Sequence, residues 1–380
     1  MFEGIFNNKR VLVTGHTGFK GSWLTEWLIR LGAQVHGLSL PVSQKNRLFK
    51  NLELEQRVSD STFADIRSQN DVRKAFDQAC PDFVFHLAAQ PLVRASYDAP
   101  IETHTTNIIG TANILEVLRQ TNRKTSAVLV TTDKCYENKE WEYSYRECDP
   151  LGGHDPYSAS KACAEIVAAS YQHSFFHLQK DIRVSTARAG NVIGGGDWAE
   201  DRIIPDIINC LEKEIPVPVR NKCATRPWQH VLEPLSGYLW LAASLHKAAP
   251  EAVTAHDSFN FGPELRSNQT VATLVKQALR STKGTWIDQS DPNEPHEATR
   301  LNLAIDKAFH LLGWQPTWDF ETSVRMTMEW YVAEREDSSL IHFTQQQITN
   351  YCADAKALCL NWTAMTASPT TKQTNSKNSQ

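Results

Sequence analysis

The stretch TGHTGFKG, residues 14–21, decides the fold that this chain is expected to adopt. It follows an apolar run, RVLVT at residues 10–14, and opens residues 19–31, whose apolar side chains recur on one helical stripe. Its three glycines are Gly15, Gly18 and Gly21. They permit a tight turn and let backbone amides approach a pyrophosphate at the helix N-terminus. The spacing departs from the more common GxGxxG, so the dinucleotide-binding interpretation depends on the position of the turn between strand and helix.

Short apolar runs alternate with helical patterns through the first half of the chain, which is typical of βαβ units and a parallel sheet. Strands are expected at residues 10–14, 33–40, 83–87, 127–131 and 183–188, with a return strand at 259–261. Helices are expected at residues 19–31, 110–120, 271–279 and 320–334. The predicted fold class is α/β: a Rossmann-type, doubly wound parallel sheet with a smaller mixed α/β domain for substrate.

After Asn191, glycines and prolines interrupt the alternation of strand and helix patterns. We place a dinucleotide-binding domain at residues 1–190, joined by a returning strand near 256–263, and a substrate-binding domain at residues 191–255 and 264–340. Residues 363–380 are polar and lack apolar periodicity, so this tail is expected to be disordered.

The composition excludes several classes of protein. The 380 residues include 39 basic and 43 acidic side chains, and the formal charge of -4 leaves no positive excess for binding nucleic acid. No apolar stretch is long enough to span a bilayer, and residues 1–10 are not typical of a signal peptide. The eight cysteines form no CxxC pair, which favours reduced thiols in the cytoplasm over disulfides or a metal site.

The second expected strand does not distinguish NAD from NADP. Residues 34–39 contain no Asp or Glu for a ribose hydroxyl, and no arginine for a 2′-phosphate follows immediately. Ser39 could hydrogen-bond a ribose hydroxyl, and a solvent-facing serine is equally consistent. Asp65 and Ile66 could flank the adenine, and the alternative for Asp65 is an ordinary loop carboxylate.

Tyr157 and Lys161 lie four residues apart in DPYSASK, at the expected start of a helix, so both side chains share one helical face. A tyrosine whose pKa is about 10 is a poor base at neutral pH. A neighbouring ammonium and a cationic nicotinamide would stabilise the phenolate and lower that pKa. YxxxK is common on exposed helices, and it becomes specific downstream of a nucleotide-binding turn.

Thr132, Asp133 and Lys134 follow the expected strand at residues 127–131, at the carboxyl edge where ligands bind in open parallel sheets. The Thr132 hydroxyl could polarise the reacting oxygen beside Tyr157. Asp133 could act as a general acid if burial raises its pKa. The alternative for Thr132 and Asp133 is a helix N-cap, a frequent role of both residue types.

Several runs of the sequence resemble the extended short-chain dehydrogenase/reductase family. The resemblance covers residues 9–335, and it implies the Rossmann-type fold and NAD as the cofactor. These runs are TGHTGFKG, HLAAQPLVRASY, NIIGTANILE and YSASK. Within that family, four longer strings are similar to those of the CDP-glucose 4,6-dehydratases, which are hydro-lyases. These strings are TTDKCYENKEW, DPLGGHDPYSASKACAE, ARAGNVIGGGDW and RPWQHVLEPLSGYL.

The resemblance implies a redox-neutral reaction on CDP-D-glucose, used in making deoxy sugars for lipopolysaccharide O-antigen. Tyr157 would take the proton of the C4 hydroxyl while hydride passes to NAD+. Water would be eliminated across C5 and C6, with Asp133 protonating the leaving hydroxide, and hydride would return to C6. The product would be CDP-4-dehydro-6-deoxy-D-glucose.

One departure concerns the base that removes the C5 proton. Relatives that act on dTDP-glucose carry Asp-Glu where this chain carries Asp133 and Lys134. A lysine serves as a base only when neutral, and the nearby cationic Lys161 favours that form. We therefore hypothesise that Lys134 is the C5 base.

The matched motifs also assign binding residues. Besides the three glycines and the catalytic pair, those assigned to the cofactor are Thr17, Phe19, Lys20, Ser39, Asp65, Ile66, Ala88, Ala89 and Asn107. Those assigned to the nucleotide-sugar are Arg188, Asn191, Arg226 and His230. Arginine suits a pyrophosphate because its planar fork donates in pairs. Trp198 and Trp228 could pack against the ligand or belong to the core. The family commonly forms homodimers, so a homo-oligomer is expected.

Two other functions remain open from the sequence. A nucleotide-sugar 4-epimerase would share the fold, Tyr157 and Lys161, but it would need no acid at Asp133 because it eliminates no water. A regulatory protein that senses the cofactor would have kept the fold and lost turnover. Against that alternative, Thr132 and the three residues just named are all present.

Overall fold

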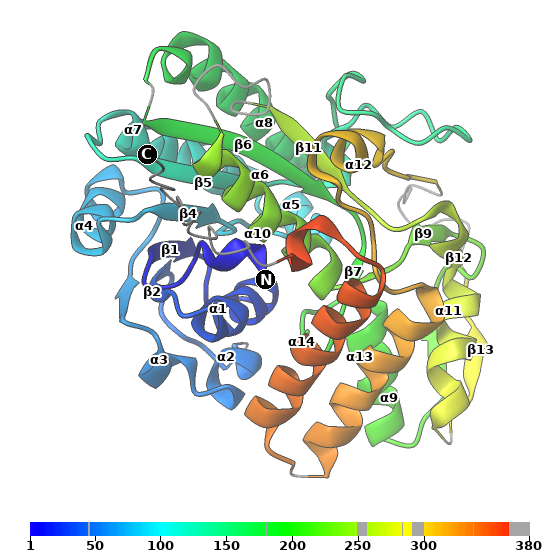
Figure 1. Cartoon of the computed structure of the whole chain (residues 1–380). Helices are drawn as coiled ribbons and strands as arrows, with labels where there is room; N and C mark the ends of the chain where they lie inside the picture. Colours follow the sequence, from blue (N-terminus) through cyan, green and yellow to red (C-terminus); the bar gives the residue numbers. More distant parts are fainter. Residues whose placement is uncertain are drawn as a thin grey trace, which may run out of the picture.

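Figure 1 shows a computed structural model of the chain, which describes residues 1–44, 46–179, 181–248, 257–282, 284–290, 300–336 and 338–364. At its centre, within these residues, is a seven-stranded sheet in the order β11-β6-β5-β4-β1-β2-β3, with all neighbouring strands parallel. Its strands are β1 (Arg10–Thr14), β2 (Gln34–Ser39), β3 (Asp60–Phe63), β4 (Phe83–His86), β5 (Thr125–Val130), β6 (Ile182–Ala189) and β11 (Ser258–Phe261). The predicted α/β fold class is confirmed.

Fourteen α-helices surround the sheets in the described part of the chain. They are α1 (Phe19–Arg30), α2 (Arg47–Asn51), α3 (Leu54–Arg57), α4 (Gln69–Ala79), α5 (Val93–Asp98), α6 (Pro100–His104), α7 (Gly110–Arg119), α8 (Pro156–Ser174), α9 (Ile203–Glu212), α10 (Leu232–Lys247), α11 (Val271–Ala278), α12 (Asp306–Leu312), α13 (Phe320–Arg335) and α14 (Leu340–Ala357). Short helical turns are η1 (Phe2–Gly4), η3 (Asp133–Cys135), η4 (Phe176–Leu178), η6 (Leu265–Ser267), η7 (Leu279–Ser281) and η8 (Asn361–Thr363), and η2 (Thr105–Ile109) is a π-helix. No described helix combines the length and the apolar character needed to cross a membrane.

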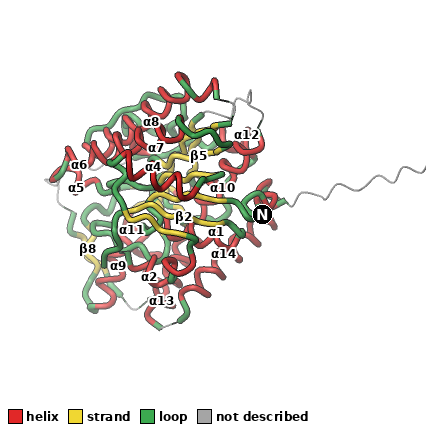
Figure 2. Tube along the Cα trace, turned by 90° about the vertical axis from the view of Figure 1, so that its left-hand side faces the viewer, coloured by secondary structure: helices red, strands yellow, loops and turns green. Residues whose placement is uncertain are grey.

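Alternating side chains bury both faces of the main sheet. Val11 and Val13 of β1 pack in one cluster with Trp23 of α1, whereas Leu12 packs in a second cluster with Ile114 of α7. The first face is covered by α1 and α10, and the second by α4, α7 and α8 (Figures 1 and 2). A strand buried on both faces has no polar side to alternate with, which explains the continuous apolar runs seen in the sequence.

The strand order reverses between β1 and β4, and the first connection, the turn of residues 14–21, leads into α1 at this point. Ligands bind at the carboxyl ends of the strands where such a reversal occurs, because the two outgoing loops diverge there. Thr14 links the two strands: its hydroxyl accepts hydrogen bonds from the Leu87 and Ala88 amides at 3.2 and 3.1 Å. The topology therefore places a ligand site beside the glycine turn.

The rest of the chain forms small sheets and helices beside the main sheet, around α9, α11 and α13 (Figure 1). The small sheets pair β7 (Val192–Ile193) with β10 (Gln229–His230), β8 (Val217–Val219) with β13 (Trp286–Asp288), and β9 (Thr225–Pro227) with β12 (Asn268–Thr270). Thr363, the first residue of the expected disordered tail, is instead buried at the end of η8, where its hydroxyl donates to the Leu360 carbonyl at 2.7 Å. From residue 365 onward the tail lies outside the described residues.

The helix α14 was not expected from the sequence, because its buried face is partly polar. Thr344 accepts a hydrogen bond from the Trp330 indole at 2.9 Å, and Gln347 donates to the Met326 carbonyl at 2.7 Å. Tyr351 adds an aromatic contact by stacking on Trp362. Polar side chains that find partners in the fold dilute the apolar stripe by which a helix is recognised.

Gly15→Ala tests the strain at the glycine turn. Gly15 has φ +72°, and an added Cβ would lie 2.8 Å from the Ala88 backbone nitrogen. We expect this change to lower the free energy of unfolding by about 1–3 kcal/mol, measured by urea denaturation without added ligand. Gly18→Ala is the matched control, since Gly18 has φ -76°, and it should cost less than about 1 kcal/mol. Equal losses in the two variants would contradict the explanation.

Candidate active site

The start of α8 positions two of the predicted catalytic side chains. The Asp155 carboxylate caps the helix, accepting hydrogen bonds from the Ser158 amide at 2.9 Å and the Ser158 hydroxyl at 2.5 Å. Pro156 occupies the first helical position, where its missing amide hydrogen costs nothing. Tyr157 and Lys161 therefore stand on the first and second turns, and both are buried.

The residues Thr132–Lys134 lie at the carboxyl end of β5, beside Tyr157. The Thr132 hydroxyl accepts a hydrogen bond from the Lys134 amide at 3.3 Å as the N-cap of η3, and it donates to Asp133 Oδ1 at 3.0 Å. It also hydrogen-bonds the Tyr157 phenol. Capping and contact with the reacting phenol are thus compatible: one threonine hydroxyl does both.

Asp133 is buried in a group of charged side chains. Burial raises the pKa of its carboxyl. The groups that oppose this rise, in order of effect, are Lys134, Thr132, Arg226 and Lys20. Asp133 Oδ2 has no hydrogen-bond partner within the described residues. A carboxyl that tends to hold its proton and has an unengaged oxygen is suited to act as a general acid.

Burial shifts the pKa values of Tyr157 and Lys161 in opposite directions. It raises the pKa of Tyr157 to about 12 and lowers the pKa of Lys161 to about 8, because each shift favours the neutral form. Lys161 Nζ donates to the Val130 carbonyl at 3.2 Å, which fixes the ammonium at the end of β5. The phenol therefore depends on nearby positive charge to ionise near neutral pH.

Lys20, in the glycine turn, belongs to the same group of buried charged side chains as Asp133 and Lys161. Burial and the charge of Arg202 lower the pKa of Lys20 to about 7, against the opposing charge of Asp133. Thr17 is buried within the turn, and Phe19 begins α1. Lys20, assigned from the sequence to the cofactor, therefore also belongs to the catalytic group of side chains.

Three other residues assigned to the cofactor lie in or against the loop that follows β4. The Ala88 amide donates to Thr14, and Ala89 follows it after β4. Asn107, within the π-helix η2, accepts a hydrogen bond from the Gln90 amide at 2.9 Å and donates to the Ser160 hydroxyl at 2.8 Å. The loop after β4 is thus tied to the helix that carries Tyr157.

The residues expected near the adenosine end are engaged locally. The Ser39 hydroxyl is buried and donates to the Leu40 carbonyl at 3.0 Å, so it does not face solvent. Asp65 accepts hydrogen bonds from Arg67 Nε at 2.8 Å and Nη2 at 2.6 Å, and this pairing lowers the pKa of the carboxyl. Ile66 is buried.

The structure separates the four residues assigned to the nucleotide-sugar into two pairs. Arg226 acts electrostatically on Asp133, and Asn191 is half-buried two residues after β6 ends at Ala189. Arg188 and His230 are buried, as Arg226 is, but their contacts lie within the protein interior. Arg188 binds other side chains there, and His230 packs edge-on against the Trp23 and Trp318 rings.

The two tryptophans left open by the sequence have partners within the protein. The Arg47 guanidinium lies 3.9 Å from the centroid of the Trp198 ring, which also packs edge-on against Tyr331. Trp228 is buried, and its indole donates to the Gln269 carbonyl at 3.0 Å. Neither contact requires a ligand.

Two charged residues near the site were missed by the sequence reasoning. Arg202, the residue before α9, pairs with Asp197 at 2.6 Å, and its charge acts on both Tyr157 and Lys20. Nothing in its sequence neighbourhood marks it, because the fold alone brings it to α8. Glu165 could have been found, since it follows Lys161 by four residues on the same helical face.

Comparison with known proteins gives the family. The family model for GDP-mannose 4,6-dehydratase matches residues 12–327. A CDP-glucose 4,6-dehydratase of Salmonella typhimurium is 42% identical, covering 92% of this chain and 98% of the relative. The chain belongs to the nucleotide-sugar 4,6-dehydratases of the extended short-chain dehydrogenase/reductase family. A probable dTDP-glucose 4,6-dehydratase of Sinorhizobium fredii, a member of the same group, is 28% identical, covering 85% of this chain and 93% of the relative.

Solved structures of both dehydratases and epimerases share the fold of this dehydratase-family chain. A dTDP-glucose 4,6-dehydratase of Streptomyces venezuelae, with NAD bound, has a TM-score of 0.72 at 23% identity, covering 87% of this chain and 98% of its own. An epimerase of Methanothermobacter thermautotrophicus has a TM-score of 0.73 at 23% identity, covering 88% of this chain and 95% of its own. At such identities the likeness shows the fold alone.

Gly190→Ala tests the placement of the Asp133 carboxyl. A Cβ at Gly190 would lie 2.7 Å from Asp133 Oδ2, so the carboxyl must turn away. We expect the rate of sugar dehydration to fall about tenfold or more, while the free energy of unfolding changes by less than about 1 kcal/mol. In the control Gly152→Ala, the nearest atom is Glu137 Cβ at 3.4 Å, and activity should be retained. Full activity in Gly190→Ala would contradict this role of Asp133.

Proposed function

We propose that this chain dehydrates CDP-D-glucose to CDP-4-dehydro-6-deoxy-D-glucose, a step toward deoxy sugars of lipopolysaccharide O-antigen. The observation that carries the proposal is the buried Asp133 carboxyl, with one unengaged oxygen, in the same site as Tyr157 and Lys161. A 4-epimerase uses such a tyrosine–lysine pair but eliminates no water, so it needs no acid there. The choice of CDP-glucose is supported by the 42% identical relative that bears this activity as its name.

We propose NAD as the cofactor, held at the glycine turn. The first turn of α1 has no side-chain cap, so its backbone amides are available to a pyrophosphate, and Gly18 leaves them uncovered. A solved dehydratase of the same fold holds NAD. Bound NAD+ would supply a hydride acceptor for C4 of the sugar and a hydride donor for C6. The residues that would hold it are Gly15, Thr17, Gly18, Phe19, Lys20, Gly21, Asp65, Ile66, Ala88, Ala89 and Asn107.

Tyr157 takes the proton of the sugar C4 hydroxyl in the proposed reaction. Burial opposes its ionisation, so the phenolate needs nearby positive charge, from Arg202 and the Lys161 ammonium, and the Thr132 hydroxyl proton, which turns from Asp133 Oδ1 to the phenolate oxygen. The product keeps a ketone at C4, so the phenol passes this proton on, to the Asp133 carboxylate or to solvent, before the next turnover. Lys161 stabilises charge in this scheme and does not itself exchange the substrate proton.

Water elimination requires one acid and one base on the C5–C6 bond. Asp133 delivers its proton to the hydroxide that leaves C6, which burial favours by raising the pKa of the carboxyl. Lys134 removes the C5 proton, so the C5–H and C6–O bonds break, a C5–C6 double bond forms and water departs. Lys20 is the alternative base, because its pKa of about 7 leaves much of it neutral at physiological pH.

We propose that the nucleotide-sugar is held by the later part of the chain, residues 191–255 and 264–340, and the cofactor by residues 1–190 with β11. Arg226 and Asn191 would contact the sugar nucleotide, and Arg202 would join them, because its charge already reaches Tyr157. Arg188 and His230 would support the site from the interior rather than touch the ligand.

We also propose a homo-oligomer assembled through α6, η2 and α8, which pack against one another. Exposed apolar side chains on or beside these elements support an interface, since clusters of this kind are typical of association surfaces. They are Tyr97, Ile101, Ile109 and Ile166. A cytoplasmic location is supported by the exposed free thiols of Cys148, Cys223 and Cys359, which a reducing compartment preserves.

Tyr157→Phe tests the proposed function. With CDP-glucose and NAD+, the parent should form a sugar nucleotide lighter by one water, and the variant should form it at least about a hundredfold more slowly. Mass spectrometry of the product is the measurement, with dTDP-, UDP- and GDP-glucose and with NADP+ as parallel arms. Tyr143→Phe, at an exposed position, should match the parent. A product of unchanged mass would favour the epimerase, and no turnover in any arm would favour a sensor.

Lys134→Ala and Lys20→Met identify the C5 base. In deuterated water the parent should incorporate deuterium at C5 during turnover, detected by NMR of the product. If Lys134 is the base, Lys134→Ala loses this exchange by at least about a hundredfold, and Lys20→Met retains it. Undiminished exchange in Lys134→Ala rules Lys134 out. Loss of exchange in Lys20→Met assigns the step to Lys20 if NADH absorbance still appears on adding substrate, because C4 oxidation is then intact.

A further inference from the structure

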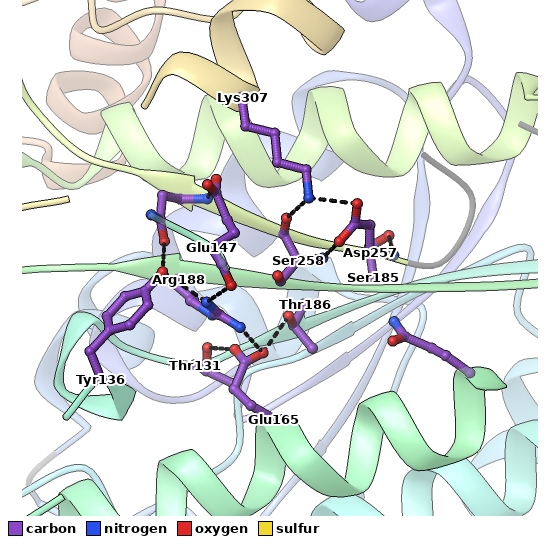
Figure 3. Close-up of polar contacts among 12 residues, drawn as sticks. Thr131, Tyr136, Glu147, Glu165, Ser185, Thr186, Arg188, Asp257, Ser258 and Lys307 are labelled. Carbon is purple, nitrogen blue, oxygen red and sulfur yellow. Dashed lines mark hydrogen bonds and ion pairs between the residues drawn. The ribbon is translucent and has the colours of Figure 1, made fainter. Parts of the chain in front are cut away.

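A buried ion pair lies behind the catalytic side chains and has no role in the scheme above. Glu165 stands on α8 four residues after Lys161, and Lys161 stands four after Tyr157, so the three side chains share one helical face. The Glu165 carboxylate accepts hydrogen bonds from the Thr131 and Thr186 hydroxyls and an ion pair from the Arg188 guanidinium, as Figure 3 shows.

These three donors tie α8 to two strands of the main sheet. Thr186 and Arg188 lie on β6, and their donor atoms are 2.7 and 2.8 Å from Glu165 Oε2. Thr131 follows β5 directly and precedes Thr132, the first residue of the catalytic turn. A single carboxylate therefore sets the distance between the helix that carries the phenol and the strand end that carries the acid.

Arg188 extends this connection to the far side of the catalytic turn. Its Nη1 atom donates to Tyr136 Oη at 2.7 Å and to the Glu147 carbonyl at 3.2 Å, and the guanidinium lies 4.9 Å from the Tyr136 ring centroid (Figure 3). Tyr136 comes two residues after Lys134, and its hydroxyl donates to Asn260 Oδ1 on β11 at 2.8 Å. The ion pair thus contacts the residues on both sides of the turn.

Glu165 stays ionised in this environment. Burial alone would raise the pKa of its carboxyl, but Arg188 and the two hydroxyls outweigh burial and lower it. A buried ion pair adds little stability compared with well-packed apolar side chains, so stability is a weak reason for its presence. What Glu165 does supply is a carboxylate one helical turn from Lys161.

That charge acts on Lys161 against the effect of burial. Burial lowers the pKa of Lys161, and Glu165 is the largest opposing influence. The other titratable groups that act on or respond to Lys161 come from other elements: Cys135 of η3, His86 of β4 and Lys20 of α1. Burial holds His86 neutral by lowering its pKa, and Lys20 is basic. Neither therefore provides a negative charge that would stabilise the Lys161 ammonium.

We propose that Glu165, paired with Arg188, is a positioning residue for the dehydration, holding the Lys161 ammonium beside the phenol and fixing the Thr132–Lys134 turn against α8. This inference rests on the proposed roles of Tyr157 and Lys161, through which Glu165 acts. It adds to those roles a specific reason why the catalytic helix carries an acid at this position.

Glu165→Gln removes the charge with little change of shape. Glu165 favours protonated Lys161, so without it Lys161 loses its proton at lower pH, and the phenolate loses its support sooner as pH rises. We expect the alkaline fall in kcat for CDP-glucose dehydration to move to lower pH by roughly one unit. At the optimum, kcat should drop about tenfold or more, with KM nearly unchanged. The measurement is the pH–rate profile.

Two companion variants separate this effect from a loss of fold. Glu165→Gln combined with Arg188→Met removes the arginine that the single change leaves unpaired, so thermal stability should recover. The alkaline limb of the pH–rate profile, where kcat falls, should stay at lower pH than in the parent. Gln172→Leu is the matched control, because Gln172 is buried on α8 and ties it to β6 through the Val184 carbonyl at 2.8 Å, without a charge. It should lose stability and keep the parent pH profile.

An alkaline limb that coincides with the parent's in both Glu165→Gln and the double variant would overturn the inference and leave the pair a structural role. A displaced limb in Gln172→Leu would overturn it too, because loosening α8 would then suffice. The proposed function is tested separately by the parent in the same assay: if the parent forms no dehydrated product from CDP-glucose, that function fails, whatever the variants do.

Discussion

The chemistry of this site depends on a phenol that its own burial makes hard to ionise. Burial raises the pKa of Tyr157 to about 12, so the fold must provide positive charge at short range before the phenol can take a proton. Arg202 provides part of that charge from the later part of the chain. A bound oxidised nicotinamide would add more, which makes proton removal depend on the oxidation state of the cofactor. Oxidation and deprotonation of the sugar are thereby coupled.

The same burial sets the other groups of the site to useful protonation states. It raises the pKa of the Asp133 carboxyl, which must give a proton away, and it lowers the pKa values of Lys20 and Lys161 toward neutrality. The fold limits these shifts with opposite charges placed by geometry rather than by sequence proximity. Asp133 is surrounded by cations, and Glu165 opposes the loss of the Lys161 proton. Acid, base and stabilising cation thus arise from ordinary side chains in one poorly solvated place.

Much of this arrangement could be predicted from the sequence, because its signals are local. The glycine turn, the apolar strands and the Tyr157–Lys161 spacing each follow from short-range geometry, and the parallel sheet follows from their order. Arg202 and the inward orientation of Arg188 could not be predicted, since they depend on packing between distant segments. The helix α14 was not predicted for a related reason: Thr344 and Gln347 are buried polar residues whose hydrogen-bond partners are known only from the fold.

The most direct test of this account is the ionisation of the Tyr157 phenol itself, followed by ultraviolet difference titration of the NAD+-bound parent against NAD+-bound Tyr157→Phe. The account requires the difference signal of a single phenolate to appear well below pH 12 when NAD+ is bound, and to shift to higher pH when the cofactor is removed. A phenol that titrates at the same pH with and without NAD+ would contradict it.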